Sequence, residues 1–286
     1  MTQEFRTPER LVHHHSHNDY LHRPLVDALE LGYTSVEVDV WRTIEAPDLL
    51  QVGNRWGDVS PPDPRRTMQR LYLDPLRAHL RATGFEPYPH RPGTVLQLLI
   101  DVKAGVSGSN DDGDETERRR LYDQLEEVLA DYADILTEYD RDGVSVQRAV
   151  NVVLTGERPG LGYILDRPKR HAAGDGVLSF LRVDDSDFRM PSSLVPLVSG
   201  RYDLNFRFQT GLERDEVAKL ARIYELAEAN GQRVRFWGGP SDRPTWQRLL
   251  APLGDVSWNR PLPVLLNTDD LAGFRSFLYP DESSGR

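Results

Sequence analysis

The chain of 286 residues contains no cysteine. It therefore has no disulfide bond, no thiolate nucleophile and no cysteine ligand for a metal. No stretch approaches the roughly 20 consecutive apolar residues that a membrane-spanning helix needs. The first dozen residues, MTQEFRTPERLV, also lack the apolar run of a secretory signal. These absences predict a cytoplasmic protein that is not integral to a membrane.

An excess of positive charge is missing as well. The formal net charge is −10 at pH 7, whereas a surface that binds nucleic acid needs a basic patch or stripe. We therefore expect no nucleic-acid partner. The expected partner is a small-molecule substrate, and nothing in the sequence indicates an organic cofactor.

Short apolar segments alternate along the chain with amphipathic ones, which predicts an α/β protein. The predicted strands are RLVHH, TSVEVDVW, VLQLLIDVK, AVNVVLTG, VLSFLRV, YDLNFRF, QRVRFW and PVLLNTD. About eight strand–helix units favour a single closed (β/α)8 barrel of the TIM type. We expect one domain over residues 1–286, with flexible tails at 1–10 and 280–286 and a mobile acidic loop at VSGSNDDGDETE.

Two predicted strands carry charged side chains on one face. In SVEVDVW, Glu37, Asp39 and Trp41 alternate with valines and so point to the same side. In LLIDVK, Asp101 and Lys103 share a face for the same reason. Charges inside a barrel are costly without partners, and carboxylate oxygens suit Mg²⁺ or Ca²⁺. Glu37, Asp39 and Asp101 are therefore candidate metal ligands, with internal ion pairs to lysine or arginine as the alternative.

The segment VHHHSHNDY lies where the first predicted strand ends. A neutral imidazole at this point, from His15 or His17, can take a proton from a hydroxyl. Asn18 or Asp19 can orient the histidine, and we expect Asp19 to contact the substrate. Lys103 can contact a phosphate or stabilise a developing oxyanion.

Aromatic residues near the strand ends predict an apolar wall for the substrate. The candidates are Trp41, Trp56 and Trp237, although tryptophan is also a common core residue. Arg235, two residues before Trp237 in QRVRFW, is a further candidate contact for the substrate.

Several of these segments resemble one known family. HSHNDYLHRPLVDALELGYTSVEVDVW, RTMQRLYLDPL, LQLLIDVK, VRFW and LLNTDDL are similar to the phosphatidylinositol phospholipase C / glycerophosphodiester phosphodiesterase-like barrels. The opening is most similar to the HSHNDY-type branch, and the resemblance runs to NTDDLAGF. It implies a phosphodiesterase-like TIM barrel.

The resemblance also implies roles for individual residues. A histidine at the position of His15, with His17 next, acts on the attacking hydroxyl. The carboxylates that hold a divalent cation match Glu37, Asp39 and Asp101. The lysine near the phosphate matches Lys103, and we also count Glu37 as a candidate for the acid/base chemistry.

One departure from the family pattern is important. The family carries a second catalytic histidine in a VGHD-like segment, but LLQVGNRWGD has Asn54 at that place. Asparagine cannot protonate a departing alkoxide, and general acid catalysis contributes roughly 10²–10⁴-fold. The expected function is therefore a repurposed one that releases no alkoxide, with Asn54 as a contact for the substrate.

That expected function is intramolecular cyclisation by acid/base catalysis. A hydroxyl adds to an activated double bond and closes a cyclic ether, in small-molecule or natural-product biosynthesis. The first alternative is a Mg²⁺- or Ca²⁺-dependent glycerophosphodiester-type phosphodiesterase with a relocated general acid. The second is a non-catalytic relic that binds a ligand.

The Asn54→His substitution separates the two enzyme hypotheses. If the chain is a phosphodiesterase that lacks its acid, the variant should hydrolyse glycerophosphodiesters up to roughly 10²–10⁴-fold faster than the unmodified chain. The measurement is turnover of a phosphodiester panel with Mg²⁺ or Ca²⁺. Brisk hydrolysis by the unmodified chain would count against cyclisation as its main activity.

Overall fold

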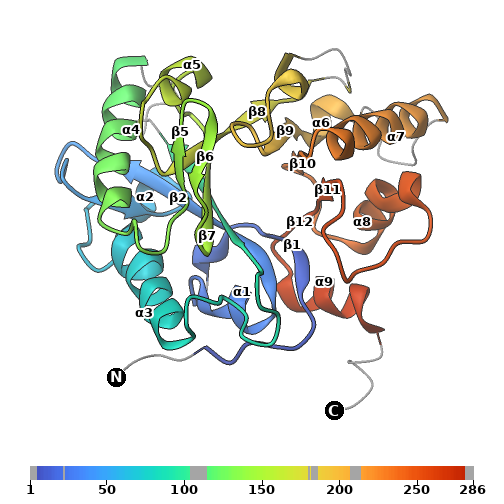
Figure 1. The fold of residues 1–286 in the computed structure, drawn as a ribbon, viewed down its shortest axis with the longest axis horizontal. Helices are drawn as coiled ribbons and strands as arrows, with labels where there is room; N and C mark the ends of the chain where they lie inside the picture. Colours follow the sequence, from blue (N-terminus) through green and yellow to red (C-terminus); the bar gives the residue numbers. More distant parts are fainter. Residues whose placement is uncertain are drawn as a thin grey trace.

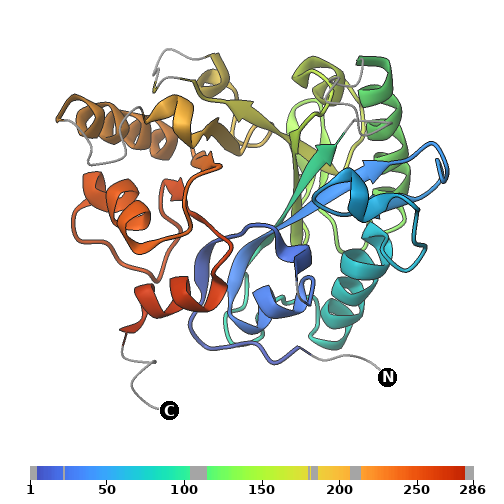
Figure 2. The ribbon, with the colours of Figure 1, turned by 180° about the vertical axis from the view of Figure 1, so that it is seen from behind.

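The computed structural model describes residues 5–21, 23–103, 115–179, 181, 186–206 and 214–280. Its main sheet is mostly parallel and nearly closed into a barrel, with helices on the outside (Figures 1 and 2). The strands of this sheet are β1 (Val12–Ser16), β2 (Tyr33–Arg42), β3 (Leu50–Val52), β4 (Leu96–Lys103), β7 (Val150–Gly156), β8 (Ala172–Val177), β9 (Leu197–Arg201), β10 (Arg233–Trp237), β11 (Val264–Leu265) and β12 (Asn267–Thr268). The prediction of an α/β barrel is confirmed at this level.

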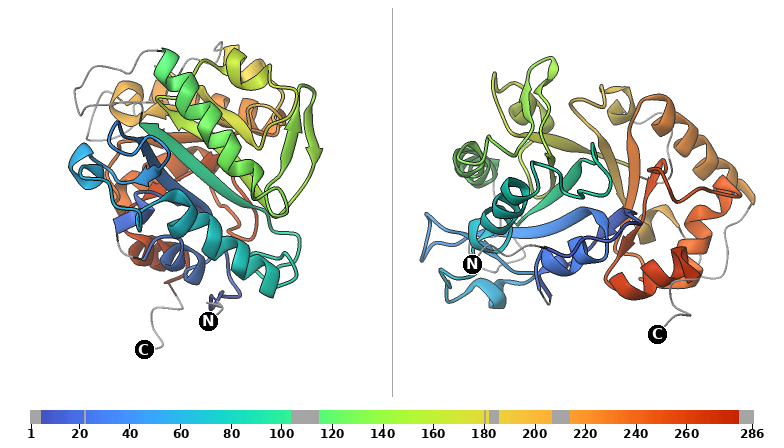
Figure 3. Two further views of the ribbon diagram at one scale, coloured as in Figure 1. Left: turned by 90° about the vertical axis from the view of Figure 1, so that its left-hand side faces the viewer. Right: turned by 60° about the horizontal axis from the view of Figure 1, so that its bottom comes forward.

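Helices follow most of the strands. The α-helices are α1 (Val26–Glu30), α2 (Trp56–Val59), α3 (Asp74–Ala82), α4 (Glu115–Ala130), α5 (Leu161–Leu165), α6 (Tyr202–Asn205), α7 (Arg214–Ala229), α8 (Arg243–Leu250) and α9 (Leu271–Leu278). Short 3-10 turns are η1 (Asp19–Leu21), η3 (Ser186–Arg189) and η4 (Ala251–Leu253), and η2 (Gln69–Leu73) is a π-helical turn before α3. A separate hairpin, β5 (Glu138–Asp140) and β6 (Gly143–Val146), lies outside the main sheet (Figure 3).

The two ends of the main sheet meet at residues 264–268. The strand order is β11-β10-β9-β8-β7-β4-β2-β1-β12, and β3 pairs antiparallel with β2. β11 pairs with β10 and β12 pairs with β1, and only Leu266 separates the two short strands. Eight regular strand–helix units are not confirmed, because the last strand is divided and β3 is an addition.

The apolar residues form a large outer core and a small inner one. The outer core lies between the sheet and the helices and includes Val36, Val38 and Val40, the valines that alternate with the acidic residues of β2. The inner cluster consists of Leu99, Val153, Leu197 and Leu265. These four residues come from β4, β7, β9 and β11, so they fill the barrel interior beneath the charged residues.

Two strand predictions in the middle of the chain are wrong. VLSFLRV was predicted as a strand, but β8 ends at Val177, and residues 180 and 182–185 lie outside the described part. YDLNFRF was also predicted as a strand, but its first four residues form α6, and residues 207–213 are not described. The true strands, AAGDGV and LVSGR, contain glycine and small residues that rank low in strand propensity.

Close packing explains the glycines of β8. A Cβ atom at Gly174 would lie 2.2 Å from Leu161 Cδ2, and one at Gly176 would lie 2.8 Å from Asp187 Cβ. Because glycine has no Cβ atom, α5 after β7 and η3 after β8 can pack close to the sheet. Glycine is required here by contacts with residues distant in the sequence, so the local sequence pattern did not reveal this strand.

The predicted tails and mobile loop are only partly described. Residues 1–4, 281–286 and 104–114 lie outside the described part. Within the predicted N-terminal tail, Phe5 is buried, and its ring lies 4.8 Å from that of His79. In the described segments, no helix combines the length and the apolar character needed to cross a bilayer.

His14 supports the divided last strand. The side chain is buried, its Nδ1 accepts a hydrogen bond from the Leu266 N–H at 3.2 Å, and its ring lies edge-on to Phe274 of α9 at 5.3 Å. Leu266 is the residue at which β11 and β12 separate, and it is 1% exposed. His14 therefore satisfies a buried donor at the join of the barrel.

The His14→Phe substitution keeps an aromatic ring but removes the acceptor. We expect the free energy of unfolding to fall by about 1–3 kcal/mol, the cost of an unsatisfied buried donor. Urea unfolding at pH 7.5 measures the change, with the exposed His90→Phe as the matched control. Equal stability of the His14 variant and the wild type would contradict the role.

The wild type and the His14→Phe variant should also differ in how their stability depends on pH. Burial, with Arg233 and His13 nearby, holds the pKa of His14 well below its ordinary value of 6.5. As the pH falls below 6.5, the unfolded chain binds a proton at this site that the folded chain does not, so stability falls. Between pH 7.5 and 5.5 the wild type should therefore lose more stability than His14→Phe.

Candidate functional site

The candidate site lies at the carboxyl ends of β2 and β4. These strands pair in parallel, so that Asp39 lies beside Asp101 and Trp41 beside Lys103. The next position along the ladder pairs Asp101 with Thr155 of β7. Alternation along each strand therefore aligns one row of polar side chains around the rim of the barrel.

Glu37, Asp39 and Asp101 form a compact acidic cluster. Each offers one carboxylate oxygen, and these oxygens lie within 4.8 Å of one another. Burial, together with Glu37 and Asp101, raises the pKa of Asp39 to about 8. Burial also raises the pKa of Asp101, although Lys103 opposes the rise. Full ionisation of all three carboxyl groups is therefore unfavourable without a further cation.

Lys103 is the cation nearest to two of these carboxylates. Its Nζ lies 2.6 Å from Asp101 Oδ2 and 3.6 Å from Asp39 Oδ2. Burial would lower the pKa of Lys103, but Asp101 and Asp39 raise it above its ordinary value. Lys103 therefore stays charged, as the predicted contact with an anion requires.

Glu37 has a different set of partners. Its Oε1 accepts a hydrogen bond from Arg235 of β10 at 2.7 Å, and its Oε2 accepts one from the Asn18 N–H at 3.0 Å. Burial would raise the pKa of Glu37, but His17 and Arg235 hold it well below its ordinary value. Arg235, predicted to contact substrate, is 2% exposed and pairs with Glu37.

His15 is the deeper of the two candidate histidines. It is fully buried, and its Nδ1 lies 2.8 Å from Ser35 Oγ and its Nε2 3.7 Å from Glu37 Oε1. Burial lowers the pKa of His15 to about 4. His15 is therefore neutral at pH 7 and packs behind Glu37.

His17 is the histidine that reaches the cavity. Its Nδ1 lies 2.7 Å from Asp269 Oδ1, and its Nε2 lies 3.5 Å from Glu37 Oε2. Burial lowers its pKa, but Glu37 and Asp269 outweigh burial, so that the pKa is raised. Asp269 orients this ring and was not among the predicted residues, although it follows the last strand in the NTDD segment. Of the two histidines, the geometry favours His17 for proton transfer.

A cavity of about 480 Å³ opens beside the cluster at the carboxyl ends of β4, β7, β8, β9 and β10. His17, Asp101, Lys103 and Arg235 line the side next to the cluster. Trp237, which is 40% exposed, lines it as well. The parallel barrel therefore places cavity and cluster at the same mouth.

The other predicted contacts lie apart from this cavity lining. Asp19 is buried and accepts hydrogen bonds from Ser16 Oγ at 2.9 Å and from the Leu25 N–H, so its oxygens serve the turn before α1. These contacts do not support a substrate role for Asp19. Asn54 is exposed on the loop between β3 and α2.

Trp41 anchors the loop that carries Asn54. Its Nε1 donates to the Gly53 carbonyl at 2.6 Å, and its ring lies 5.9 Å from that of Trp56. The two tryptophans therefore hold the loop at the end of β2. Trp41, although it shares a face with Asp39, is only partly buried.

The donor set fits a divalent cation. Asp101 Oδ1 is buried and has no hydrogen-bond partner among the described residues, and its environment holds further carboxylate oxygens within 4.8 Å. Hard cations such as Mg²⁺ and Ca²⁺ take oxygen ligands of this kind. Asp39, Asp101 and Glu37 are the residues that would hold such an ion.

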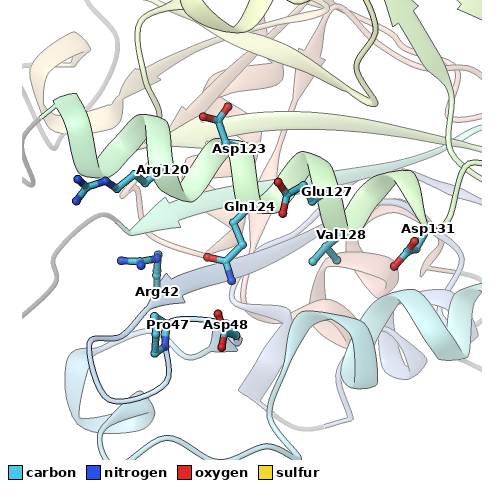
Figure 4. A pocket seen from close by; sticks show the side chains of 9 residues that line it. All are labelled: Arg42, Pro47, Asp48, Arg120, Asp123, Gln124, Glu127, Val128 and Asp131. Carbon is cyan, nitrogen blue, oxygen red and sulfur yellow. The ribbon is translucent and has the colours of Figure 1, made fainter.

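A second hollow lies outside the barrel, between α4 and the loop after β2 (Figure 4). Its lining mixes arginine with carboxylates from α4, including Arg120, Asp123 and Glu127. Arg42, at its edge, already pairs with Glu117 at 3.3 Å. None of the predicted site residues lines this hollow, so it is not the candidate site.

Comparison with known proteins decides the family. The family model of the AIM6-like phosphodiesterase domain matches residues 5–167. The chain belongs to this family. The matched region contains the acidic cluster, Lys103 and both histidines, which confirms the resemblance at the level of a phosphodiesterase-like domain.

Curated relatives extend over more of the chain. Altered inheritance of mitochondria protein 6 of Candida glabrata is 27% identical over 310 residues, and that of Eremothecium gossypii is 30% identical over 289 residues. Each alignment covers 92% of this chain. It covers 70% of the Candida glabrata protein and 68% of the Eremothecium gossypii protein. The protein of the same name from Saccharomyces cerevisiae is 28% identical over 79% of this chain and 61% of the relative.

The Asp39→Asn substitution tests the cation site. Without cation the variant should be at least as stable as the wild type, because it removes one of three repelling carboxylates. Excess Mg²⁺ or Ca²⁺ should stabilise the wild type, by about 2.7 kcal/mol at a hundredfold excess over Kd, but not the variant. Unfolding with chelator and with cation measures both effects.

The control for this experiment is Asp166→Asn, whose side chain is 82% exposed. It should respond to the cation as the wild type does. If the cation stabilises Asp39→Asn as much as the control, the ion binds elsewhere.

Proposed function

We propose that the chain is a divalent-cation-dependent enzyme that cleaves phosphodiester bonds in a small-molecule substrate. The observation that carries the proposal is the acidic cluster at the edge of a cavity that also presents Lys103 and His17. Family membership supports the same reaction class. A bound cation would neutralise phosphate charge and polarise the phosphorus centre.

The residues of the chain supply the other elements of the reaction. The ammonium group of Lys103 attracts the phosphate to the rim of the cluster. Asp269 holds the His17 ring by its Nδ1, which leaves Nε2 as the atom that exchanges a proton with the attacking hydroxyl. His17 and Arg235 hold the pKa of Glu37 well below its ordinary value, so Glu37 is too weak a base to compete for that proton.

The cavity wall beyond the phosphate suits a partly apolar group. Leu178, Leu204 and Trp237 line that part of the cavity. These side chains can contact an uncharged or apolar substituent of the phosphodiester.

We also propose that the chain belongs to the HSHNDY-type branch, with Asn54 in the place of the second histidine. Asn54 lies next to Gly53, whose N–H donates to the Asp39 carbonyl at 3.3 Å. The position is therefore close to the cluster along the backbone, although the side chain is exposed. A phosphodiesterase without an acid at this position needs another proton donor.

Intramolecular cyclisation, the function that we expected from the sequence, stays an untested alternative. It would use His17 for the hydroxyl proton and Lys103 for the developing negative charge. The observation that favours it is Asn54, which cannot act as an acid. We place it second because the family model describes a phosphodiesterase domain.

Substitution of the two histidines tests the proposal. With Mg²⁺ or Ca²⁺, the wild type should hydrolyse glycerophosphodiesters, and His17→Asn should lower turnover by roughly 10²–10⁴-fold. His15→Asn should lower turnover less, because His15 does not line the cavity. Unfolding temperatures of both variants show that each is folded at the assay temperature.

The exposed His90→Asn is the matched control and should keep wild-type turnover. A larger loss in His15→Asn than in an equally folded His17→Asn would return the proton-transfer role to His15. No hydrolysis of any phosphodiester by the wild type would reject the proposed function.

A further inference from the structure

The cavity wall contains a buried carboxyl group that the proposed function does not use. Asp175 of β8 is 2% exposed and lines the cavity. Its Oδ2 accepts a hydrogen bond from Thr155 Oγ1 at 2.8 Å. Its Oδ1 is buried and has no hydrogen-bond partner in the described part of the chain. A free carboxyl oxygen in a cavity wall is available to a ligand.

Thr155 connects Asp175 to the acidic cluster. It lies beside Asp101 in the ladder between β4 and β7, and its hydroxyl bonds to Asp175 on the far side. Asp175 is thus two strands from Asp101, which corresponds to roughly 10 Å between their backbones. A phosphate held at the cluster, with its substituent in the cavity, fits between these two carboxyl groups.

The strand order places His17 and Asp175 on opposite sides of the acidic cluster. β1, which His17 follows, lies on one side of β2 and β4, and β8 lies on the other side, beyond β7. In phosphoryl transfer the attacking and leaving oxygens lie roughly in line. The group that acts on the attacking oxygen should therefore lie opposite the group that acts on the leaving oxygen. His17 and Asp175 have this arrangement.

Burial favours the protonated form of Asp175. It raises the pKa of Asp175 to about 6, although Ser199, Arg235, Thr155 and Arg158 oppose the rise. Arg158 donates to the Asp175 backbone carbonyl rather than to its carboxylate. A carboxyl group in this environment can hold a proton near neutral pH and release it in a reaction.

We propose that Asp175 is the general acid that protonates the leaving oxygen. This inference rests on the proposed phosphodiesterase function and names the proton donor that Asn54 cannot supply. The attacking oxygen bonds to phosphorus as its proton passes to His17. The bond from phosphorus to the leaving oxygen breaks as that oxygen takes the Asp175 proton. Asp175 ends as a carboxylate and His17 as an imidazolium, and proton exchange with water restores both.

A purely structural role for Asp175 has a different signature. If the carboxyl group only fixes Thr155 at the end of β7, its removal disturbs the site for every substrate alike. A general acid, in contrast, is needed only when the leaving group is a poor one. The choice of leaving group therefore separates the two roles.

The experiment compares wild type, Asp175→Asn and Asp175→Glu on two substrates with excess Mg²⁺ or Ca²⁺. Glycerophosphocholine releases a poorly leaving alkoxide, whereas bis(4-nitrophenyl) phosphate releases a nitrophenolate that leaves without protonation. We expect Asp175→Asn to lower kcat/KM for glycerophosphocholine by roughly 10²–10⁴-fold and to leave the nitrophenyl ester within a few-fold. Asp175→Glu should restore part of the loss.

The control variant is Asp166→Asn, which should match the wild type on both substrates. The proposal also predicts that Asn54→His adds little, because an acid is already present. Equal losses on both substrates, or no loss on either, would overturn the role of Asp175 while the proposed function stands. A wild type that cleaves neither substrate would overturn both.

Discussion

The rest of the site depends on the burial of the Glu37 carboxylate. A charged carboxylate in a barrel interior is costly unless several groups compensate it. Glu37 receives Arg235 from β10 and the Asn18 N–H from the turn after β1, with His15 and His17 within 3.7 Å. These partners come from opposite ends of the chain. Compensation of this one charge therefore requires the sheet to curve until its first and last strands meet.

The compensation is uneven across the cluster. Glu37 has its cationic partner at hydrogen-bond distance and stays ionised. Asp39 and Asp101 both pair with Lys103, and Asp101 retains an oxygen without a hydrogen-bond partner among the described residues. Glu37 thus connects distant parts of the barrel, whereas Asp101 lines the cavity and Asp39 lies buried beside it. The carboxyl groups that have unused charge or hydrogen-bonding capacity therefore lie nearer the rim of the barrel than the fully paired Glu37.

The sequence predicted the half of the site that lies on regular strands. Glu37, Asp39, Asp101 and Lys103 could be found because β2 and β4 alternate strictly, and alternation reveals which residues share a face. Asp175 could not be found, since β8 contains two glycines that serve contacts with distant segments. The choice between His15 and His17 also lay beyond the pattern. Both belong to one strand face, and only depth in the barrel distinguishes them.

The hydrogen bond from His17 to Asp269 joins residues 252 positions apart. Ribosomes synthesise a chain from its N-terminus. His17, Glu37 and Asp101 therefore emerge from the ribosome before Arg235 and Asp269. Until the segment that contains β12 is free, the histidine ring has no orienting carboxylate and the barrel has no join. A growing chain therefore carries an incomplete site until the segment with Asp269 has been made.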